Sequence, residues 1–76
     1  MMTIPQLRDW HTTLAGTLAG QVYGDFRFAD GERIRTSRVI RRYRRNGRLY
    51  ARTHGSTYQL TGPDGQPYDD WLATDA

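Results

Sequence analysis

Arginine and tyrosine side chains crowd one stretch of this sequence, and together they have the chemistry of an anion-binding surface. The stretch reads Val-Ile-Arg-Arg-Tyr-Arg-Arg-Asn-Gly-Arg-Leu-Tyr-Ala-Arg-Thr and runs from Val39 to Thr53. Guanidinium groups bind phosphates and carboxylates through paired hydrogen bonds, while tyrosine rings stack and their hydroxyl groups form hydrogen bonds. The candidate functional residues of the chain therefore lie here.

Asn46-Gly47 lies in the middle of this stretch and predicts a β-hairpin. Two β-prone runs flank the dipeptide, which favours a two-residue type I′ turn. Such a turn fixes the register, so that Tyr43 lies opposite Tyr50 and Ile40 opposite Thr53. Because side chains alternate between the two faces of a strand, one face of the hairpin gathers arginines and tyrosines. These residues, called the basic face below, are Arg41, Tyr43, Arg45, Arg48, Tyr50 and Arg52.

The predicted register places like charges directly opposite each other, which destabilises a sheet. The two cross-strand pairs are Arg41 with Arg52 and Arg45 with Arg48. A bound anion would relieve this repulsion, and the candidates are a nucleic acid, an acidic protein surface, or solvent counterions with nearby carboxylates. The structural alternative is a solvated sheet face with an ordinary aromatic pair. Arg42 and Arg44 fall on the other face, where we expect them to project past the core and add flanking charge.

The other potentially reactive side chains do not form the pattern of an active site. His11 and His54 are the only histidines, and no cysteine or second ligand lies at zinc spacing. His54 and Ser56 share a tight turn in which nothing orients the imidazole. The neighbouring carboxylates of Asp69 and Asp70 would point in different directions. The scattered glycines do not form a phosphate-binding loop. The sequence therefore predicts a non-enzymatic protein without a metal or cofactor.

Charge is distributed unevenly along the 76 residues, whose net charge is +3. Residues 27–52 hold ten of the eleven basic residues against Asp30 and Glu32, a local balance of +8. The segments before and after carry −1 and −4. All eleven basic residues are arginine, which suits a recognition surface. The codon bias of a GC-rich genome would produce the same composition.

The length and composition indicate one small domain, residues 1–76. A chain of this size buries only about 60% of its unfolded surface. It has no cysteine, so we expect its stability to come from packing or from oligomerisation. No long apolar run and no apolar segment behind a basic start are present. These features predict a protein without a membrane segment, located in the cytoplasm.

The N-terminal stretch predicts a helix over residues 4–15. Thr3 is placed as the N-cap, Gln6 as its capping-box partner, and Gly16 as the C-terminal stop. Apolar residues recur at helical spacing in Ile4, Leu7, Trp10 and Leu14.

Strands are predicted at about 18–28, 33–44, 48–53 and 57–61, where apolar residues alternate. Glycine interrupts the first strand at Gly24, where we expect a break, and the second is expected to bulge near Ser37-Arg38. A three-residue loop after the first strand would pair Phe28 with Ile34. A two-residue turn at His54-Gly55 pairs Leu49 with Leu60 and Ala51 with Tyr58, and it puts the same residues on the core side as the central hairpin does.

These elements together predict an α+β fold. The N-terminal helix packs on a four-stranded antiparallel meander that is strongly coiled or partly closed into a small barrel. A short helical turn at about 67–73 folds Trp71 and Leu72 back onto the sheet.

Residues 18–40 resemble a pattern of short phage and prophage proteins. The shared features, in this order before a second hairpin, are Val22-Tyr23-Gly24, Arg27-Phe28, Asp30-Gly31 and Thr36-Ser37. Phage proteins of this length include inhibitors of host machinery, anti-CRISPR proteins among them, and this is the function that the resemblance implies. Many anti-CRISPR proteins are acidic and imitate DNA, whereas this chain is basic. The implied mode is therefore a clamp on an acidic surface of an effector complex, or on its RNA- or DNA-facing part.

Three hypotheses follow for a protein in the cytoplasm of a bacterial host. In the first, a phage-type inhibitor blocks a host complex by binding an acidic protein surface or a nucleoprotein through the basic face. In the second, a nucleic-acid-binding module uses the same face, with affinity that falls steeply with salt. In the third, a phage structural protein self-associates into an oligomer.

Overall fold

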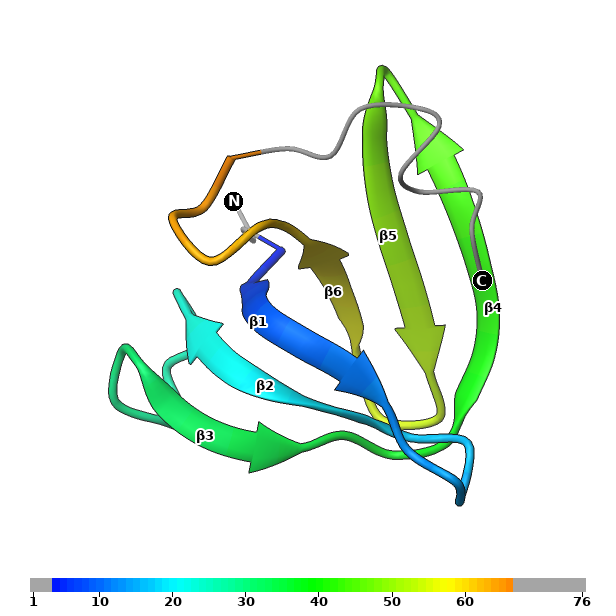
Figure 1. Cartoon of the computed structure of the whole chain (residues 1–76), viewed down its shortest axis with the longest axis horizontal. Helices are drawn as coiled ribbons and strands as arrows, with labels where there is room; N and C mark the ends of the chain where they lie inside the picture. Colours follow the sequence, from blue (N-terminus) through cyan, green and yellow to red (C-terminus); the bar gives the residue numbers. More distant parts are fainter. Residues whose placement is uncertain (1–3, 67–76) are drawn as a thin grey trace.

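A single sheet of six strands makes up the part of the chain that the computed structural model describes, residues 4–66 (Figure 1). The strand order is β3-β2-β1-β6-β5-β4. β1 is parallel to β6, and the other neighbouring pairs are antiparallel. The strands are β1 (Gln6–Thr12), β2 (Leu18–Tyr23), β3 (Glu32–Arg35), β4 (Val39–Arg45), β5 (Arg48–Thr53) and β6 (Thr57–Leu60). The predicted α+β class and four-stranded antiparallel meander are therefore wrong, because the described chain is all-β with a mixed sheet.

The predicted helix over residues 4–15 is wrong because this segment forms β1, in the middle of the sheet. Backbone N–H groups of Gln59 and Thr61 in the β6 segment donate to the carbonyl oxygens of Pro5 and Leu7, at 2.9 and 3.1 Å. These bonds join the two ends of the described chain. Because the partner is far away in sequence, local helical signals at residues 4–15 could not reveal it.

A β-bulge in β1 explains the misleading helical spacing. Asp9 has a left-handed backbone with φ 50°, and the pairing with β2 shifts between Arg8 and His11. The extra residue reverses the alternation of side chains, so that Leu7 and Trp10, three residues apart, both pack against the core. The outer members of the predicted stripe are exposed: Ile4 and Leu14.

β2 ends at Tyr23, earlier than the predicted end at residue 28. Gly24 has φ 80° and breaks the strand where a break was expected. Asp25 then holds a turn, because its Oδ1 accepts a hydrogen bond from the backbone N–H of Arg27 at 3.0 Å. The predicted pairing after this turn is also wrong, since Ile34 lies opposite Gly20.

The predicted strand over residues 33–44 is divided into β3 and β4, which form the two opposite edges of the sheet. Thr36 makes the corner: its backbone N–H donates to the Leu18 carbonyl oxygen at 2.8 Å, and its Oγ1 accepts from the Leu18 N–H at 3.0 Å. The Val39 N–H then donates to the Gly16 carbonyl oxygen at 2.9 Å. Between the two edges the chain thus runs alongside the β1–β2 turn and the start of β2.

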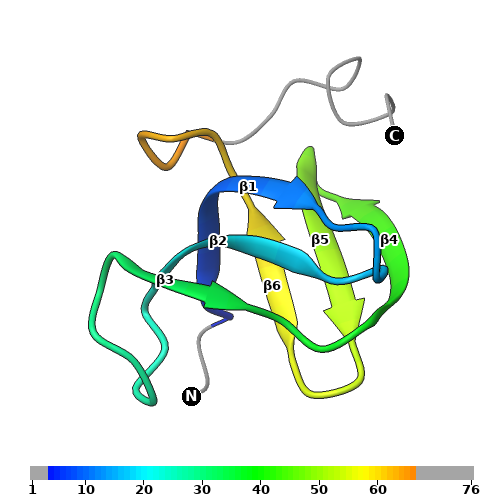
Figure 2. The same cartoon turned by 60° about the horizontal axis from the view of Figure 1, so that its bottom comes forward.

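The other predicted strands agree with the structure, 48–53 with β5 and 57–61 with β6. Their inward side chains join β1 and β2 in one core, made by Leu7, Leu18, Val22, Leu49, Ala51, Tyr58 and Leu60. The sheet bends strongly around this core (Figure 2) but is not closed, so the predicted partly closed barrel is not formed.

The predicted helical turn at 67–73, with Trp71 and Leu72, lies outside the described residues. Within residues 4–66 no helix is long and apolar enough to cross a membrane.

Candidate anion-binding face

The β4–β5 hairpin has the predicted turn and the predicted register. Asn46 and Gly47 have φ values of 52° and 74°, the left-handed conformations that a type I′ turn requires. Tyr43 lies opposite Tyr50, as predicted. The one departure is at the far end, where Val39 and not Ile40 pairs with Thr53, because the register shifts between Val39 and Arg41.

The two sides of this hairpin differ sharply in burial. Leu49 and Ala51 are 4% and 0% exposed and belong to the core. The four arginines of the basic face are exposed on the opposite side, and its two tyrosines are half-buried. The pairing of β5 with β6 has the predicted register too. The registers with β4 and with β6 therefore agree on which side chains of β5 point away from the core.

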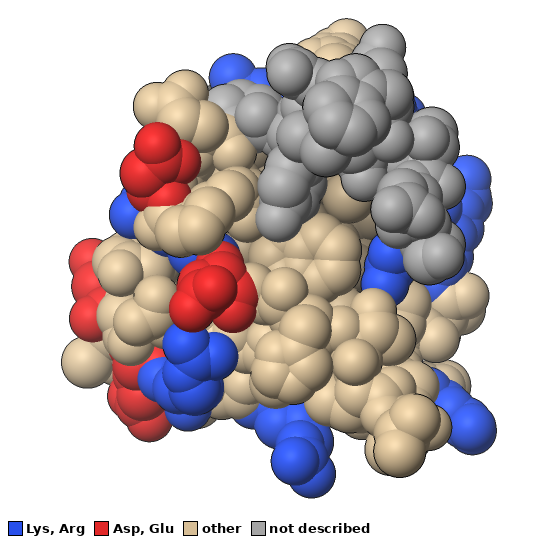
Figure 3. Space-filling view, viewed as in Figure 1, with Lys and Arg blue, Asp and Glu red and all other residues tan. Residues whose placement is uncertain are grey.

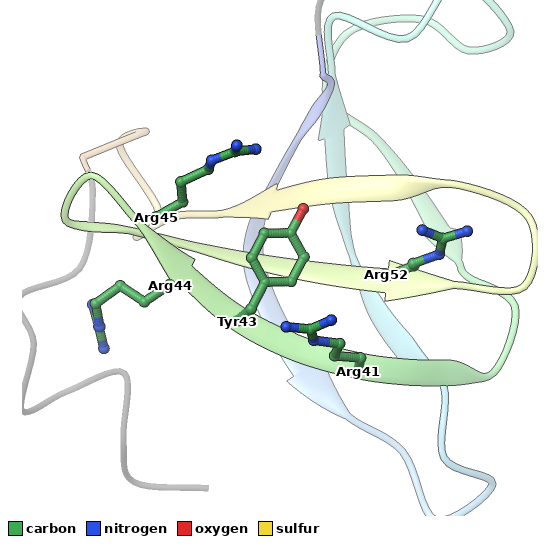
Figure 4. Close-up of a pocket in the computed structure, with 5 residues that line it drawn as sticks. All are labelled: Arg41, Tyr43, Arg44, Arg45 and Arg52. Atoms are coloured by element: carbon green, nitrogen blue, oxygen red, sulfur yellow. The ribbon is translucent and has the colours of Figure 1, made fainter.

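The two tyrosines stack on each other at the centre of the basic face. The ring centroids of Tyr43 and Tyr50 are 5.3 Å apart and the rings are inclined by 19°. The guanidinium carbon of Arg41 lies over the Tyr43 ring, 5.4 Å from its centroid. Tyr43 therefore already contacts an aromatic ring and a cation within the chain, and its hydroxyl group points across the hairpin in Figure 4.

A hollow of about 350 Å³ opens on this face around Tyr43. Its lining residues are Arg41, Tyr43, Arg44, Arg45 and Arg52. Figure 4 shows the side chains of Arg41, Arg45 and Arg52 around the Tyr43 ring, whereas that of Arg44 points away from it. The lining side chains are hydrogen-bond donors, and they come from both strands of the hairpin.

Carboxylates of the described chain do not neutralise the basic face. Within residues 4–66 the ion pairs are Arg27–Asp25 and Arg33–Asp9, at 2.7 and 3.0 Å. The cross-strand pair of Arg41 and Arg52 is present in the register. In the view of Figure 3, acidic and basic side chains alternate on the side where β3 lies, whereas the charged side chains along β4 are basic. The described chain thus has one side where acidic and basic residues are mixed and one side that is basic.

Of the two predicted flanking charges, Arg42 lies apart from the basic face, whereas Arg44 is one of the residues that line its hollow. Arg42 reaches across the inner side of the sheet to β1, where its guanidinium lies 5.2 Å from the centroid of the Trp10 ring and its Nη2 donates to Thr12 Oγ1. Arg44 is half-buried and also lies on the Leu49 side of the hairpin. Arg42 therefore connects β4 to β1 and does not widen the basic face.

A second charged cluster, which the sequence did not predict, joins the β2–β3 loop to the β5–β6 hairpin. Arg27 donates to both carboxylate oxygens of Asp25, at 3.0 and 2.7 Å, and also to Ser56 Oγ at 3.0 Å and Tyr58 Oη at 3.3 Å. The hydrogen bonds from Arg27 lower the pKa of the Asp25 carboxyl, and Asp25 in turn raises the pKa of Arg27. The only signal in the sequence for the pair is the spacing of two residues between Asp25 and Arg27.

The side chains weighed as catalytic candidates are not assembled into a site within the described chain. His11 and His54 are both exposed, on β1 and in the β5–β6 turn. Ser56 accepts a hydrogen bond from Arg27. Residues 4–66 contain no group of three potential metal ligands close enough to hold an ion. Asp69 and Asp70 lie outside the described part.

Comparison of the chain with protein-family models, curated proteins and solved structures finds no match in any of the three.

Proposed function

We propose that this protein is a non-enzymatic binding protein that attaches to a negatively charged partner through the basic face. Residues 18–40 resemble short phage and prophage proteins, and proteins of this kind include inhibitors of host machinery. By that analogy it would act stoichiometrically, by occupying a surface of a host complex, an acidic protein or a nucleoprotein. The observation that carries this proposal is the cross-strand pair of Arg41 and Arg52, which meets no carboxylate of residues 4–66 at ion-pair distance.

The energetics of the hairpin support this proposal. Like charges directly opposite each other disfavour strand pairing. Holding these arginines together therefore lowers the stability of the folded protein. The type I′ turn and the tyrosine stack fix the backbone positions from which these arginines extend before any partner binds. Preorganised charges lose less conformational entropy on binding, and they raise the rate of encounter with an anionic surface.

A nucleic acid is the second candidate partner, and the hollow favours it because its lining side chains donate hydrogen bonds and carry positive charge. A fluorescence titration with single- and double-stranded DNA and RNA at low and at physiological salt separates the two. Binding that weakens steeply with salt supports a nucleic-acid partner. Absence of such binding, together with capture of a host complex that the protein inhibits, supports the acidic protein surface.

The test of the proposal itself is a charge reversal with a matched control. Replacing Arg41 and Arg52 with Glu should lower affinity for the partner at least tenfold. Replacing Arg35 and Arg38 with Glu changes the net charge equally at exposed residues outside the basic face, and should have a much smaller effect. Circular dichroism checks that both variants fold. Equal losses in the two folded variants would overturn the proposal.

A further inference from the structure

The hollow on the basic face has the features of a site for one compact anion. Four arginines line it, Arg41, Arg44 and Arg45 from β4 and Arg52 from β5, and the side chains of Arg41, Arg45 and Arg52 are the ones that lie around Tyr43 (Figure 4). Figure 4 shows the Tyr43 hydroxyl directed across the hairpin, between the side chains of Arg45 and Arg52. These groups meet around a single space of about 350 Å³, near the lower end of the size range of small-molecule sites.

The lining side chains restrict the ligand to a group rich in acceptor oxygens. The guanidinium groups of Arg41, Arg45 and Arg52 can only donate hydrogen bonds, and a neutral phenol donates to an anion. A carboxylate is planar and carries a single charge on two oxygens. A phosphate is tetrahedral and presents three or more oxygens in different directions, which several guanidinium groups can bind at once. Phosphate therefore matches donors that surround a space better than carboxylate does.

The tyrosine stack indicates that the rings themselves are not platforms for a base. Tyr43 is in contact with Tyr50 through its ring, and the Arg41 guanidinium lies over the same ring. Stacking of a nucleobase on Tyr43 would have to compete with these contacts. The hydroxyl group is the part of this side chain left for the ligand, so recognition depends on the phosphate and not on the base attached to it.

From these observations we infer that the hollow binds the phosphate group of a phosphate ester through Arg41, Arg45, Arg52 and the Tyr43 hydroxyl. This inference rests on the proposed function of the basic face and adds the chemical class of the ligand. It also separates residues that share the face, because Arg48 and Tyr50 do not line the hollow. A general attraction of charge would make no such distinction.

Calorimetric titration of the whole protein tests the ligand class. Phenyl phosphate is compared with benzoate, which has the same ring but a carboxylate, at matched ionic strength. We expect phenyl phosphate to bind at least tenfold more tightly. Adenosine 5′-monophosphate and adenylyl-adenosine, a phosphate diester, show which kind of phosphate ester is bound. Similar affinities for phenyl phosphate and the nucleotide support recognition of the monoester group itself. Tighter binding of the diester supports a nucleic-acid backbone. Equal binding of phenyl phosphate and benzoate would overturn the inference.

Two pairs of variants test the residues. Arg45→Gln and Arg48→Gln remove the same charge from opposed positions beside the same turn, and only Arg45 lines the hollow. Tyr43→Phe and Tyr50→Phe each keep a ring in the stack and remove one hydroxyl. We expect Arg45→Gln and Tyr43→Phe to weaken phenyl phosphate binding at least fivefold, and their controls less than twofold.

The failure of this inference can be told apart from the failure of the proposed function. If each variant pair loses affinity equally while Arg41→Glu with Arg52→Glu still abolishes partner binding, the phosphate site is wrong and the basic face remains the docking surface. If partner binding also survives that double replacement, both are wrong.

Discussion

At the scale of single residues, Asp25 is the most constrained charged group in the described chain. Its side chain is 4% exposed, and both of its carboxylate oxygens accept hydrogen bonds from Arg27. These bonds favour the ionised form, so the pKa of Asp25 in the folded protein lies below its ordinary value of 3.8. Asp25 therefore stabilises the fold above that value, and the contribution is lost as the pH falls through the lowered pKa.

Replacing Asp25 with Asn should lower the free energy of unfolding at neutral pH by about 1–3 kcal/mol, because the hydrogen bonds from Arg27 lose their charged acceptor. The difference between the two proteins should shrink as the medium becomes acidic enough to protonate Asp25. Chemical unfolding across this pH range measures it. A difference that stays constant into strong acid would show that Asp25 does not stabilise the fold through its charge.

Gly20 is a second residue whose type is dictated by close packing. A β-carbon placed there would lie 2.9 Å from the Arg8 carbonyl oxygen and 3.0 Å from both Leu7 Cγ and Trp10 Cβ. The bulged part of β1 packs directly against Gly20. The nearest atom is a backbone oxygen, so it cannot move aside as the end of a flexible side chain could.

Gly20→Ala should therefore destabilise the protein by about 1–3 kcal/mol, the usual cost of overpacking. Gly62→Ala is the matched control, since a β-carbon at Gly62 would come no closer than 3.6 Å to other atoms. Neither glycine has a positive φ, so strain of the backbone does not separate them. Thermal unfolding of the two variants is the measurement, and equal midpoints would contradict the packing described at β1.

At the scale of elements, the turn at Asn46-Gly47 fixes the position of every side chain on the basic face. Both turn residues have positive φ. A β-branched residue at Gly47 would be strained in that conformation by about 1–2 kcal/mol, whereas glycine in place of Asn46 would not.

Gly47→Val should accordingly lower stability and weaken partner binding, while Asn46→Gly should change both much less. Unfolding experiments and a binding titration on the same samples test this. Unchanged binding by a destabilised Gly47→Val variant would mean that the geometry of the hairpin does not matter for recognition.

The elements that were predicted correctly are those whose signals are local. Asn46-Gly47 determines a turn and a register by its own conformational preferences, and His54-Gly55 gives a second register that agrees with it. The basic face follows from these two turns and from alternation, so its arrangement could be predicted from the sequence.

The N-terminal strand was missed because its determinants are not local. Leu7 and Trp10 are spaced as in a helix only because Asp9 forms a bulge, and the parallel partner β6 lies at the other end of the described chain. Arg42 was misplaced for the same reason. The Arg42 side chain turns inward to the Trp10 ring, which belongs to β1. A prediction that makes residues 4–15 a helix does not place Trp10 within its reach.

At the scale of the whole molecule, the two edges of the sheet differ in charge, since only the β4 edge is uniformly basic. The β2–β3 loop contains Asp25 and Asp30 together with Arg27, whereas the opposite edge strand, β4, holds four arginines and no acidic residue. Repulsion along β4 is a cost that ions in solution reduce.

Salt should therefore stabilise the protein slightly, and phosphate should stabilise it more than chloride at equal ionic strength, because a ligand of the folded state shifts unfolding. The additional effect of phosphate should vanish when Arg41 and Arg52 are replaced with Gln, which controls for general salting-out. Thermal unfolding measures this. An identical phosphate effect in the variant would show that it does not arise from the basic face.

The most direct test of the basic face as the binding surface is a map of where an anion binds. In a heteronuclear NMR titration of the labelled protein with an RNA oligonucleotide or an oligoglutamate peptide at low salt, the bound probe should shift signals of residues 41–45 and 48–52. Signals of β3 and the β2–β3 loop should stay unchanged. Shifts concentrated there, or binding by neither probe, would contradict an anion-binding role for this hairpin.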